Sequence, residues 1–173
     1  MSSALVVIDM LNDFVREDGA LTCGDRVGEI IEPIRRRIEQ ARRDGETVIY
    51  MCDSHRPDDP EFAQYPPHAV QGTEGAQVID ELAPAEEDYV LPKRRYSAFH
   101  QTQLLLVLLE NGVRELELTG VCTNICVLYT AADAVSWGFD VSVDASRVAA
   151  LDDGAHEIGL GQLEDVLGVA VNR

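Results

Sequence analysis

A single lysine stands out among the residues of this chain that can do chemistry. Lys93 is the one lysine among 14 lysine and arginine residues. A guanidinium keeps its proton in proteins, whereas a desolvated ammonium is a compact and tunable point charge. This imbalance favours a chemical role for Lys93. A lysine kept by chance on the surface would give the same composition, so the neighbouring motifs have to decide.

A sulfur nucleophile is predicted in the turn at residues 120–126. The turn follows an apolar strand, and Thr123 is suited to cap the helix that comes next. Cys126 then falls in the first helical turn, where free N–H groups and the helix dipole favour an anion. With Lys93 nearby, its thiol is expected to ionise near neutral pH. Alternatively, Cys122 and Cys126 are small buried residues on one helix face, and a disulfide between them is also open.

Asp53, His55 and His68 are candidate metal ligands. An Asp-x-His pair together with a distant histidine supplies the oxygen and imidazole ligands that suit Zn²⁺, Fe²⁺ or Mn²⁺. Such residues in a loop are also often ordinary polar surface residues, so the pattern alone does not decide. His100 and His156 have no comparable neighbours and are predicted to be structural.

The composition indicates one acidic globular domain. A chain of 173 residues can bury a core without metal or disulfide staples, and its net charge of −17 is spread along the sequence. This charge argues against nucleic acid as a partner and fits a protein that stays soluble at high salt. Neither a signal peptide nor a membrane span is recognisable, so a cytoplasmic location is expected. The four cysteines have unmatched spacings and are expected to be mostly free thiols.

Apolar runs alternate with amphipathic stretches along the chain. Strands are predicted at residues 4–9, 47–52, 89–93, 115–119, 140–144 and 169–171, and helices at residues 25–43, 102–111, 123–137 and 154–167. The alternation predicts a single three-layer α/β/α domain over residues 1–173, with a mostly parallel, Rossmann-like six-stranded sheet. Residues 53–88 hold five of the seven prolines and show little periodicity, which favours a functional loop region.

The chemically interesting residues fall where the predicted strands end. Asp9 ends the first strand, Asp53 and His55 follow the second, Lys93 ends the third, and residues 120–126 follow the fourth. Ligands of open α/β sheets bind beyond the carboxyl ends of the strands. The sequence therefore predicts that these side chains converge on one crevice.

Five groups of motifs together resemble the isochorismatase-like cysteine hydrolase superfamily, and within it the nicotinamidases most closely. They are Val-Ile-Asp-Met-Leu-Asn-Asp-Phe at residues 7–14, Asp-Ser-His at 53–55, Tyr-Pro-Pro-His with Val-Gln-Gly-Thr-Glu-Gly-Ala at 65–76, Lys-Arg-Arg-Tyr-Ser-Ala-Phe at 93–99 and Gly-Val-Cys-Thr-Asn-Ile-Cys-Val at 120–127. They occur in the family's order and span nearly the whole chain. The resemblance implies an isochorismatase-like hydrolase fold.

The resemblance also implies a role for each catalytic candidate. It makes Cys126 the nucleophile, Asp9 the acid/base and Lys93 the third member of a triad that hydrolyses a small amide through a thioester. The backbone N–H groups of Cys122 and Cys126 would form the oxyanion hole, with a cis peptide bond between Val121 and Cys122.

A divalent metal ion is the cofactor that the resemblance implies. Asp53, His55 and His68 would bind it and present it to the pyridine nitrogen of nicotinamide. Zn²⁺ is expected, with Fe²⁺ or Mn²⁺ as alternatives. Glu61 resembles a fourth ligand found in some members, but two neighbouring acids, Asp58 and Asp59, compete for that role.

Phe14, Tyr65 and Tyr96 resemble the aromatic walls of a pocket for a flat ring, with core packing as the alternative for each. The family pattern is not complete, because Asn124 stands where aspartate is frequent and Tyr65 where tryptophan is frequent. The expected reaction is hydrolysis of nicotinamide to nicotinate and ammonia, a step of NAD salvage. The alternatives are an N-carbamoyl, ureido or other small-amide hydrolase, and a non-catalytic binding module derived from such an enzyme. The resemblance also implies a homo-oligomer.

Overall fold

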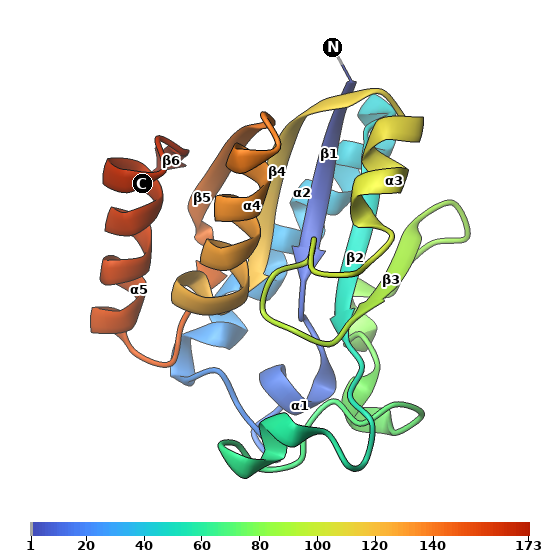
Figure 1. The fold of residues 1–173 in the computed structure, drawn as a ribbon, viewed down its shortest axis with the longest axis vertical. Helices are drawn as coiled ribbons and strands as arrows, with labels where there is room; N and C mark the ends of the chain where they lie inside the picture. The colour runs from blue at the N-terminus through green and yellow to red at the C-terminus, as the bar shows by residue number, and fades with distance from the viewer. Residues whose placement is uncertain (1) are drawn as a thin grey trace.

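The computed structural model describes residues 2–173 and shows a parallel sheet between two layers of helices (Figure 1). The six strands lie in the order β3-β2-β1-β4-β5-β6, and every pairing is parallel. Their bounds are Ser2–Ile8 for β1, Thr47–Asp53 for β2, Tyr89–Lys93 for β3, Val113–Val121 for β4, Asp140–Ala149 for β5 and Ala170–Asn172 for β6. The predicted three-layer fold with a six-stranded sheet is confirmed.

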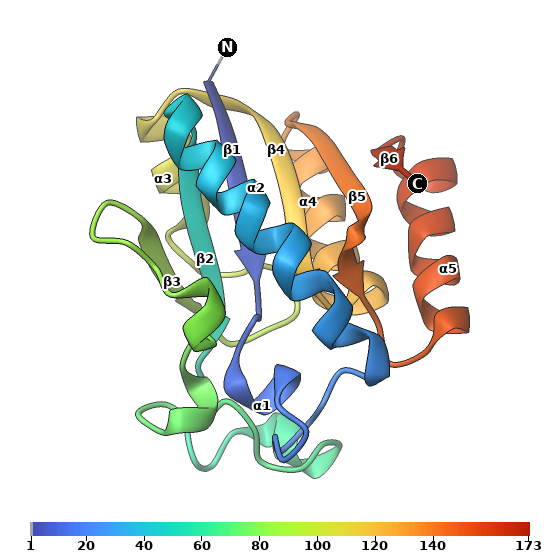
Figure 2. The same cartoon turned by 180° about the vertical axis from the view of Figure 1, so that it is seen from behind.

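Helices cover both faces of the sheet. Helices α3 (Leu104–Glu110), α4 (Leu128–Ser136) and α5 (Asp153–Gly161) lie on one side, and α2 (Ile31–Asp44) crosses the other, as Figure 2 shows from behind. Strand β1 is apolar and buried from Ala4 to Ile8, because alternate residues pack against different helix layers. Val6 packs in the core under α3 and α4, whereas Val7 packs in the core under α2.

The end of the sheet where β1 and β2 finish is covered by irregular chain. Short α1 (Asn12–Val15) lies there, together with residues 53–88, in which the regular structure is limited to 3₁₀ turns and a short strand-like pairing (Figure 1). This agrees with the lack of periodicity in that segment. Within residues 2–173, no helix is both long enough and apolar enough to cross a membrane.

Three predicted helices differ from the prediction because their conformation changes along their length. The predicted helix at residues 25–43 begins as a 3₁₀ helix (Asp25–Ile30) and becomes α-helical only in α2. Pro33 explains this change, because proline has no N–H to donate four residues back in a continuous α-helix. Residues 123–137 likewise divide into a π-helical turn (Thr123–Val127) and α4, and the last helix continues as a π-helical turn (Gln162–Val166) after α5.

Gly120 near the end of β4 allows the two central strands to approach closely. Its φ is +103°, and a Cβ atom at this position would lie 2.0 Å from the carbonyl oxygen of Ile8. We expect Gly120→Ala to lower the free energy of unfolding by about 3 kcal/mol or more, because both the backbone conformation and the β1 contact would have to change.

Gly112→Ala is the matched control for this prediction. Gly112 also has positive φ, +63°, but a Cβ atom there would meet nothing within 4 Å. Gly112→Ala should lower the free energy of unfolding by about 1–2 kcal/mol, which is the cost of placing alanine in a left-handed backbone conformation. Urea unfolding measures the free energy of unfolding of both variants. Equal decreases would show that the close contact with Ile8 does not contribute to the effect of Gly120→Ala.

Candidate active site

Four side chains converge at the carboxyl edge of the sheet, as the strand ends predict. Asp9 follows β1, Asp53 ends β2, Lys93 ends β3, and Cys126 lies in the π-helical turn after β4. These strands are consecutive neighbours in the sheet, so the four residues meet although they are up to 117 positions apart. Asp9 itself has a positive φ of 54°, and its N–H donates to the carbonyl of Met51 at 2.9 Å.

The Lys93 ammonium lies between the sulfur and the carboxylates. Its Nζ is 2.8 Å from Asp9 Oδ2 and 3.5 Å from Cys126 Sγ. Lys93 and Asp9 are each 1% exposed, and Cys126 is 8% exposed. A lysine so deeply buried has to be paired, which excludes the interpretation of Lys93 as a surface residue kept by chance.

Asp53 contacts the same ammonium, which the sequence did not predict. Its Oδ1 is 2.5 Å from Lys93 Nζ, and its backbone N–H donates to Asp9 Oδ1 at 2.9 Å. Asp53 and Lys93 are register partners on β2 and β3, so parallel pairing of two strands that end together is the signal that could have revealed this contact.

Burial and the clustered charges shift the pKa values of these groups. Burial and the neighbouring Asp53 raise the pKa of Asp9 to about 6, although Lys93 opposes the shift. Burial also lowers the pKa of Lys93, but Asp53 and Asp9 outweigh it and raise that pKa well above its ordinary value. Lys93 is therefore a permanent cation in this site.

The expectation of a preformed Cys126 thiolate is wrong. Burial raises the pKa of the Cys126 thiol well above its ordinary value; Lys93 opposes the shift, and the nearby carboxylates of Asp9 and Asp53 add to it. Because the thiol keeps its proton at neutral pH, a base has to remove it. Asp9 Oδ2 is suited to that task, because it accepts no aligned hydrogen bond from residues 2–173.

The turn that carries Cys126 is held by α5 and not by a cap. Thr123 is not the predicted N-cap, since the π-helical turn begins at Thr123 itself and no side chain caps it. The Thr123 hydroxyl instead lies 2.9 Å from Nδ1 of His156 on α5. Gly159 lets α5 approach closely, because a Cβ atom there would be 2.9 Å from the backbone N of Asn124. The peptide bond between Val121 and Cys122 is cis, as the resemblance implies.

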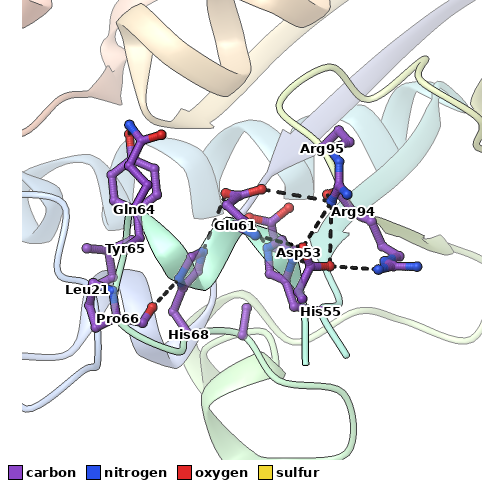
Figure 3. Close-up of polar contacts among 12 residues, drawn as sticks. Leu21, Asp53, His55, Glu61, Gln64, Tyr65, Pro66, His68, Arg94 and Arg95 are labelled. Carbon is purple, nitrogen blue, oxygen red and sulfur yellow. Dashed lines mark hydrogen bonds and ion pairs between the residues drawn. The ribbon is translucent and has the colours of Figure 1, made fainter. Parts of the chain in front are cut away.

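A cluster of possible metal ligands lies next to the predicted catalytic side chains (Figure 3). One ligand atom each from Asp53, His55 and His68 lies within 4.8 Å of the others, and all three residues are buried. His68 Nδ1 is 2.8 Å from the carbonyl oxygen of Pro66, and its Nε2 is 4.0 Å from Glu61 Oε1. The predicted candidates are thus brought together, and Glu61 lies at their edge.

The structure separates the three acids that compete for the fourth position. Asp58 is exposed and pairs with Arg56. Asp59 is buried and bound by two guanidinium groups, with Arg94 at 2.7 Å and Arg95 at 3.3 Å. Burial raises the pKa of Asp59, but Arg94 and other donors outweigh it and hold that pKa well below its ordinary value.

A pocket opens over Cys126 and Asp9. The three predicted aromatic residues, Phe14, Tyr65 and Tyr96, all line it. Sequence reasoning missed several apolar lining residues. Val121 and Ile125 lie within the motif at residues 120–127, whereas Leu21 and Cys23 come from one loop and Leu151 from another, and these three carry no shared motif. No arginine lines this pocket within residues 2–173, and its carboxylates are Asp9, Asp53 and Glu61.

Comparison with known proteins decides the family. The family model described as the isochorismatase domain matches residues 3–172. The chain belongs to the isochorismatase family. As a member of this family of hydrolases it resembles the nicotinamidase/pyrazinamidase PncA of Bacillus subtilis, with 38% identity, a TM-score of 0.95 and full coverage of both chains.

Two further solved structures share this fold. The N-carbamoylsarcosine amidase of Thermoplasma acidophilum is 39% identical, with a TM-score of 0.90 over 100% of this chain and 96% of that one. The pyrazinamidase of Pyrococcus horikoshii, solved in complex with zinc, is 28% identical, with a TM-score of 0.93 over 100% and 99%. Membership therefore supports hydrolysis of an amide in a small molecule, while the substrate has to come from the pocket.

Proposed function

We propose that this protein hydrolyses nicotinamide to nicotinate and ammonia, with Cys126 as nucleophile. The observation that carries the proposal is the contact of the Lys93 ammonium with both Cys126 Sγ and Asp9 at the floor of an apolar pocket. The same three residues argue against a non-catalytic binding module, because a buried ion pair beside a buried thiol is costly to keep without a use for it.

The geometry supports a two-stage mechanism. Asp9 takes the proton of the Cys126 thiol, and the sulfur attacks the amide carbonyl carbon. Asp9 then gives the proton to the departing ammonia, which leaves a thioester. Asp9 next accepts a proton from the water molecule whose oxygen attacks the thioester carbon. As the C–S bond breaks, Asp9 returns this proton to the Cys126 sulfur, which restores the thiol and releases the acid. Lys93 keeps the summed charge of Asp9 and sulfur compensated throughout.

The negative charge that develops on the carbonyl oxygen needs donors in the same turn. The backbone N–H groups of Cys122 and Cys126 are the proposed donors, as the resemblance implies. They belong to one turn that α5 fixes from outside through the contacts of His156 and Gly159. Such prearranged donors stabilise the transition state without reorganising during the reaction.

The pocket favours a neutral ring over a substrate with a carboxylate. Phe14, Tyr65 and Tyr96 offer flat apolar surfaces, and within residues 2–173 no arginine lines the pocket to pair with a substrate carboxylate. An N-carbamoyl amino acid brings a carboxylate that would need a cationic partner. Nicotinamide is uncharged and needs none.

The residues present fit a divalent metal ion beside the ring. Neither ring nitrogen of His55 has an aligned hydrogen-bond partner within residues 2–173, although the residue is completely buried. Asp53, His55 and His68 would bind the ion. Two further carboxylates lie beside them: Glu61 Oε1 is 4.0 Å from His68 Nε2, and Asp59 Oδ2, which Arg94 and Arg95 also bind, is 3.3 Å from His55 Nδ1. A bound ion supplies a Lewis-acidic position that a ring nitrogen of the substrate can occupy. The zinc in the Pyrococcus horikoshii relative supports zinc here.

A substrate panel tests the proposed function. We expect ammonia release from nicotinamide and pyrazinamide with kcat/KM at least about 100-fold above that for N-carbamoylsarcosine. Benzamide, which lacks the ring nitrogen, should be a poorer substrate than nicotinamide. Preference for the carbamoyl substrate would reverse the assignment, and no turnover of any amide would favour the binding module.

The pH dependence of hydrolysis should report the Asp9 carboxylate. Below its pKa of about 6, Asp9 is protonated and cannot accept the thiol proton, so kcat/KM should fall about tenfold per pH unit as the pH decreases. The measurement is the pH profile of kcat/KM for nicotinamide from pH 4.5 to 8. A flat profile through pH 5 would contradict Asp9 as the base.

The expected fall of kcat/KM at low pH cannot come from unfolding that is caused by protonation of Asp9. Because the folded-state pKa of Asp9 lies above its ordinary value of 3.8, the folded protein binds the proton more tightly. The contribution of this group to stability is therefore complete at low pH and is lost as the pH rises through about 6. Thermal unfolding recorded across the same range provides the control.

Metal binding can be measured without activity. The purified protein should contain about one divalent ion per chain by elemental analysis, and His68→Ala should lower its affinity at least about tenfold. His100→Ala is the matched control, because His100 is exposed and outside the cluster. Equal metal content in both variants would contradict the site.

A further inference from the structure

Two thiols face each other in the wall of the pocket. Cys23 and Cys122 are separated by 99 positions in sequence, yet their sulfur atoms are 3.1 Å apart. Both are free, buried and part of the pocket lining, with exposures of 4% and 7%. Nothing in their spacing indicates this pair, and the mechanism proposed above uses neither sulfur.

The backbone holds both thiols in place. The N–H of Cys23 donates to the carbonyl of Phe14 at 2.9 Å, which ties the loop after α1 to the pocket wall. The carbonyl of Cys122 accepts hydrogen bonds from the N–H groups of Ile125 and Val127 at 3.0 and 3.2 Å. The two sulfurs therefore meet because their chain segments are fixed and not because of a flexible loop.

We propose that Cys23 and Cys122 form a reversible disulfide when a hydroperoxide enters the pocket. The Cys122 sulfur attacks one oxygen of hydrogen peroxide, the O–O bond breaks, and the other oxygen leaves as water with the thiol proton. The Cys23 sulfur attacks the resulting sulfenic acid, the S–S bond forms, and a second water leaves with the remaining proton. Two thiols are oxidised while one peroxide is reduced.

The geometry favours this pair over the other cysteines. A disulfide bond is about 2.05 Å long, so sulfurs now 3.1 Å apart need to approach by only about 1 Å. Cys52 is buried in β2 and is not among the residues that line the pocket. The Cys126 sulfur faces the Lys93 ammonium at 3.5 Å.

The disulfide would switch off hydrolysis. Cys122 supplies one proposed oxyanion donor, and drawing its side chain toward Cys23 moves the turn that holds this donor. This consequence rests on the proposed function, whereas formation of the bond does not. Oxidation is expected to lower kcat/KM at least about tenfold, and a thiol reductant should restore it.

Peptide mass analysis tests the bond directly. The protein is treated with hydrogen peroxide, its remaining thiols are alkylated without reduction, and it is digested. We expect a cross-linked peptide that joins Cys23 to Cys122 and disappears after reduction. Cys23→Ser should abolish this peptide. Cys126→Ser and the matched control Cys52→Ser should both retain it.

Each result has a defined meaning. Absence of the cross-link in the peroxide-treated protein, its loss in Cys126→Ser, or a link from Cys122 to Cys126 instead would overturn the proposal. Because the link is read by mass, a protein that forms it but releases no ammonia from any amide contradicts only the proposed function. An active protein that forms no link contradicts only the disulfide.

Discussion

Replacing Cys126 with alanine is expected to lower kcat for nicotinamide at least about 10³-fold. The Cys126 sulfur is the proposed nucleophile and lies 3.5 Å from Lys93 Nζ, and no other side chain in the pocket can form the thioester from the same position. Asp9 and Lys93 remain in the variant, so substrate binding should persist while the chemical step is lost. Ammonia release and binding of nicotinamide by calorimetry measure the two separately.

Cys52→Ala is the control that measures the effect of removing a buried thiol outside the pocket. Cys52 is as deeply buried as Cys126 but lies in β2 and does not line the pocket. Its kcat should stay within about threefold of that of the unmodified protein. Activity that survives in Cys126→Ala would show that hydrolysis does not pass through a thioester at this sulfur.

Replacing Lys93 with methionine is expected to damage both stability and catalysis. The change leaves the buried carboxylates of Asp9 and Asp53 without their shared cation, which should cost about 3–5 kcal/mol of unfolding free energy. Activity should fall at least about 10²-fold, because the carboxylates then repel a developing thiolate. Urea unfolding and ammonia release measure the two effects.

The pH dependence of the Lys93→Met defect identifies its cause. Without the cation, burial and mutual repulsion raise the pKa of the paired carboxyl groups in the folded state, so protonation stabilises the variant. The stability difference from the unmodified protein should therefore shrink as the pH falls below 6. Arg36→Met, which removes an exposed pair with Glu32, should cost at most about 1 kcal/mol at every pH. If Lys93→Met lowers the free energy of unfolding by no more than Arg36→Met does, the buried contacts of Lys93 with Asp9 and Asp53 do not stabilise the fold.

The spacing of the apolar residues and the order of the predicted strands along the chain were enough to predict the sheet and the residues at its carboxyl edge. Strand β3 has the predicted bounds, and the ends of β1 to β4 place Asp9, Asp53, Lys93 and Cys126 together because parallel strands end on one side. The type of helix was predicted less well. Pro33 has no N–H to donate, which changes the hydrogen-bond pattern of the helix but leaves the spacing of its apolar residues unchanged.

Contacts that depend on the path of the loops could not be predicted from the sequence. The Cys23 and Cys122 pair, the two arginines on Asp59 and the contact between Thr123 and His156 each join distant segments without a shared period or motif. The protonation of Cys126 was mispredicted for a related reason. Helix position and a nearby ammonium are readable from sequence, but the degree of burial and the second carboxylate are properties of the folded site.

The burial of Lys93 has a practical consequence for handling the protein. With the only lysine enclosed beneath the pocket, the side chains exposed to solvent offer no primary amine to a coupling reagent. Activated esters and aldehydes that label ordinary proteins at many lysines would therefore find no lysine side chain on the surface of residues 2–173. The buried Lys93 ammonium would stay unmodified under conditions that label exposed lysines.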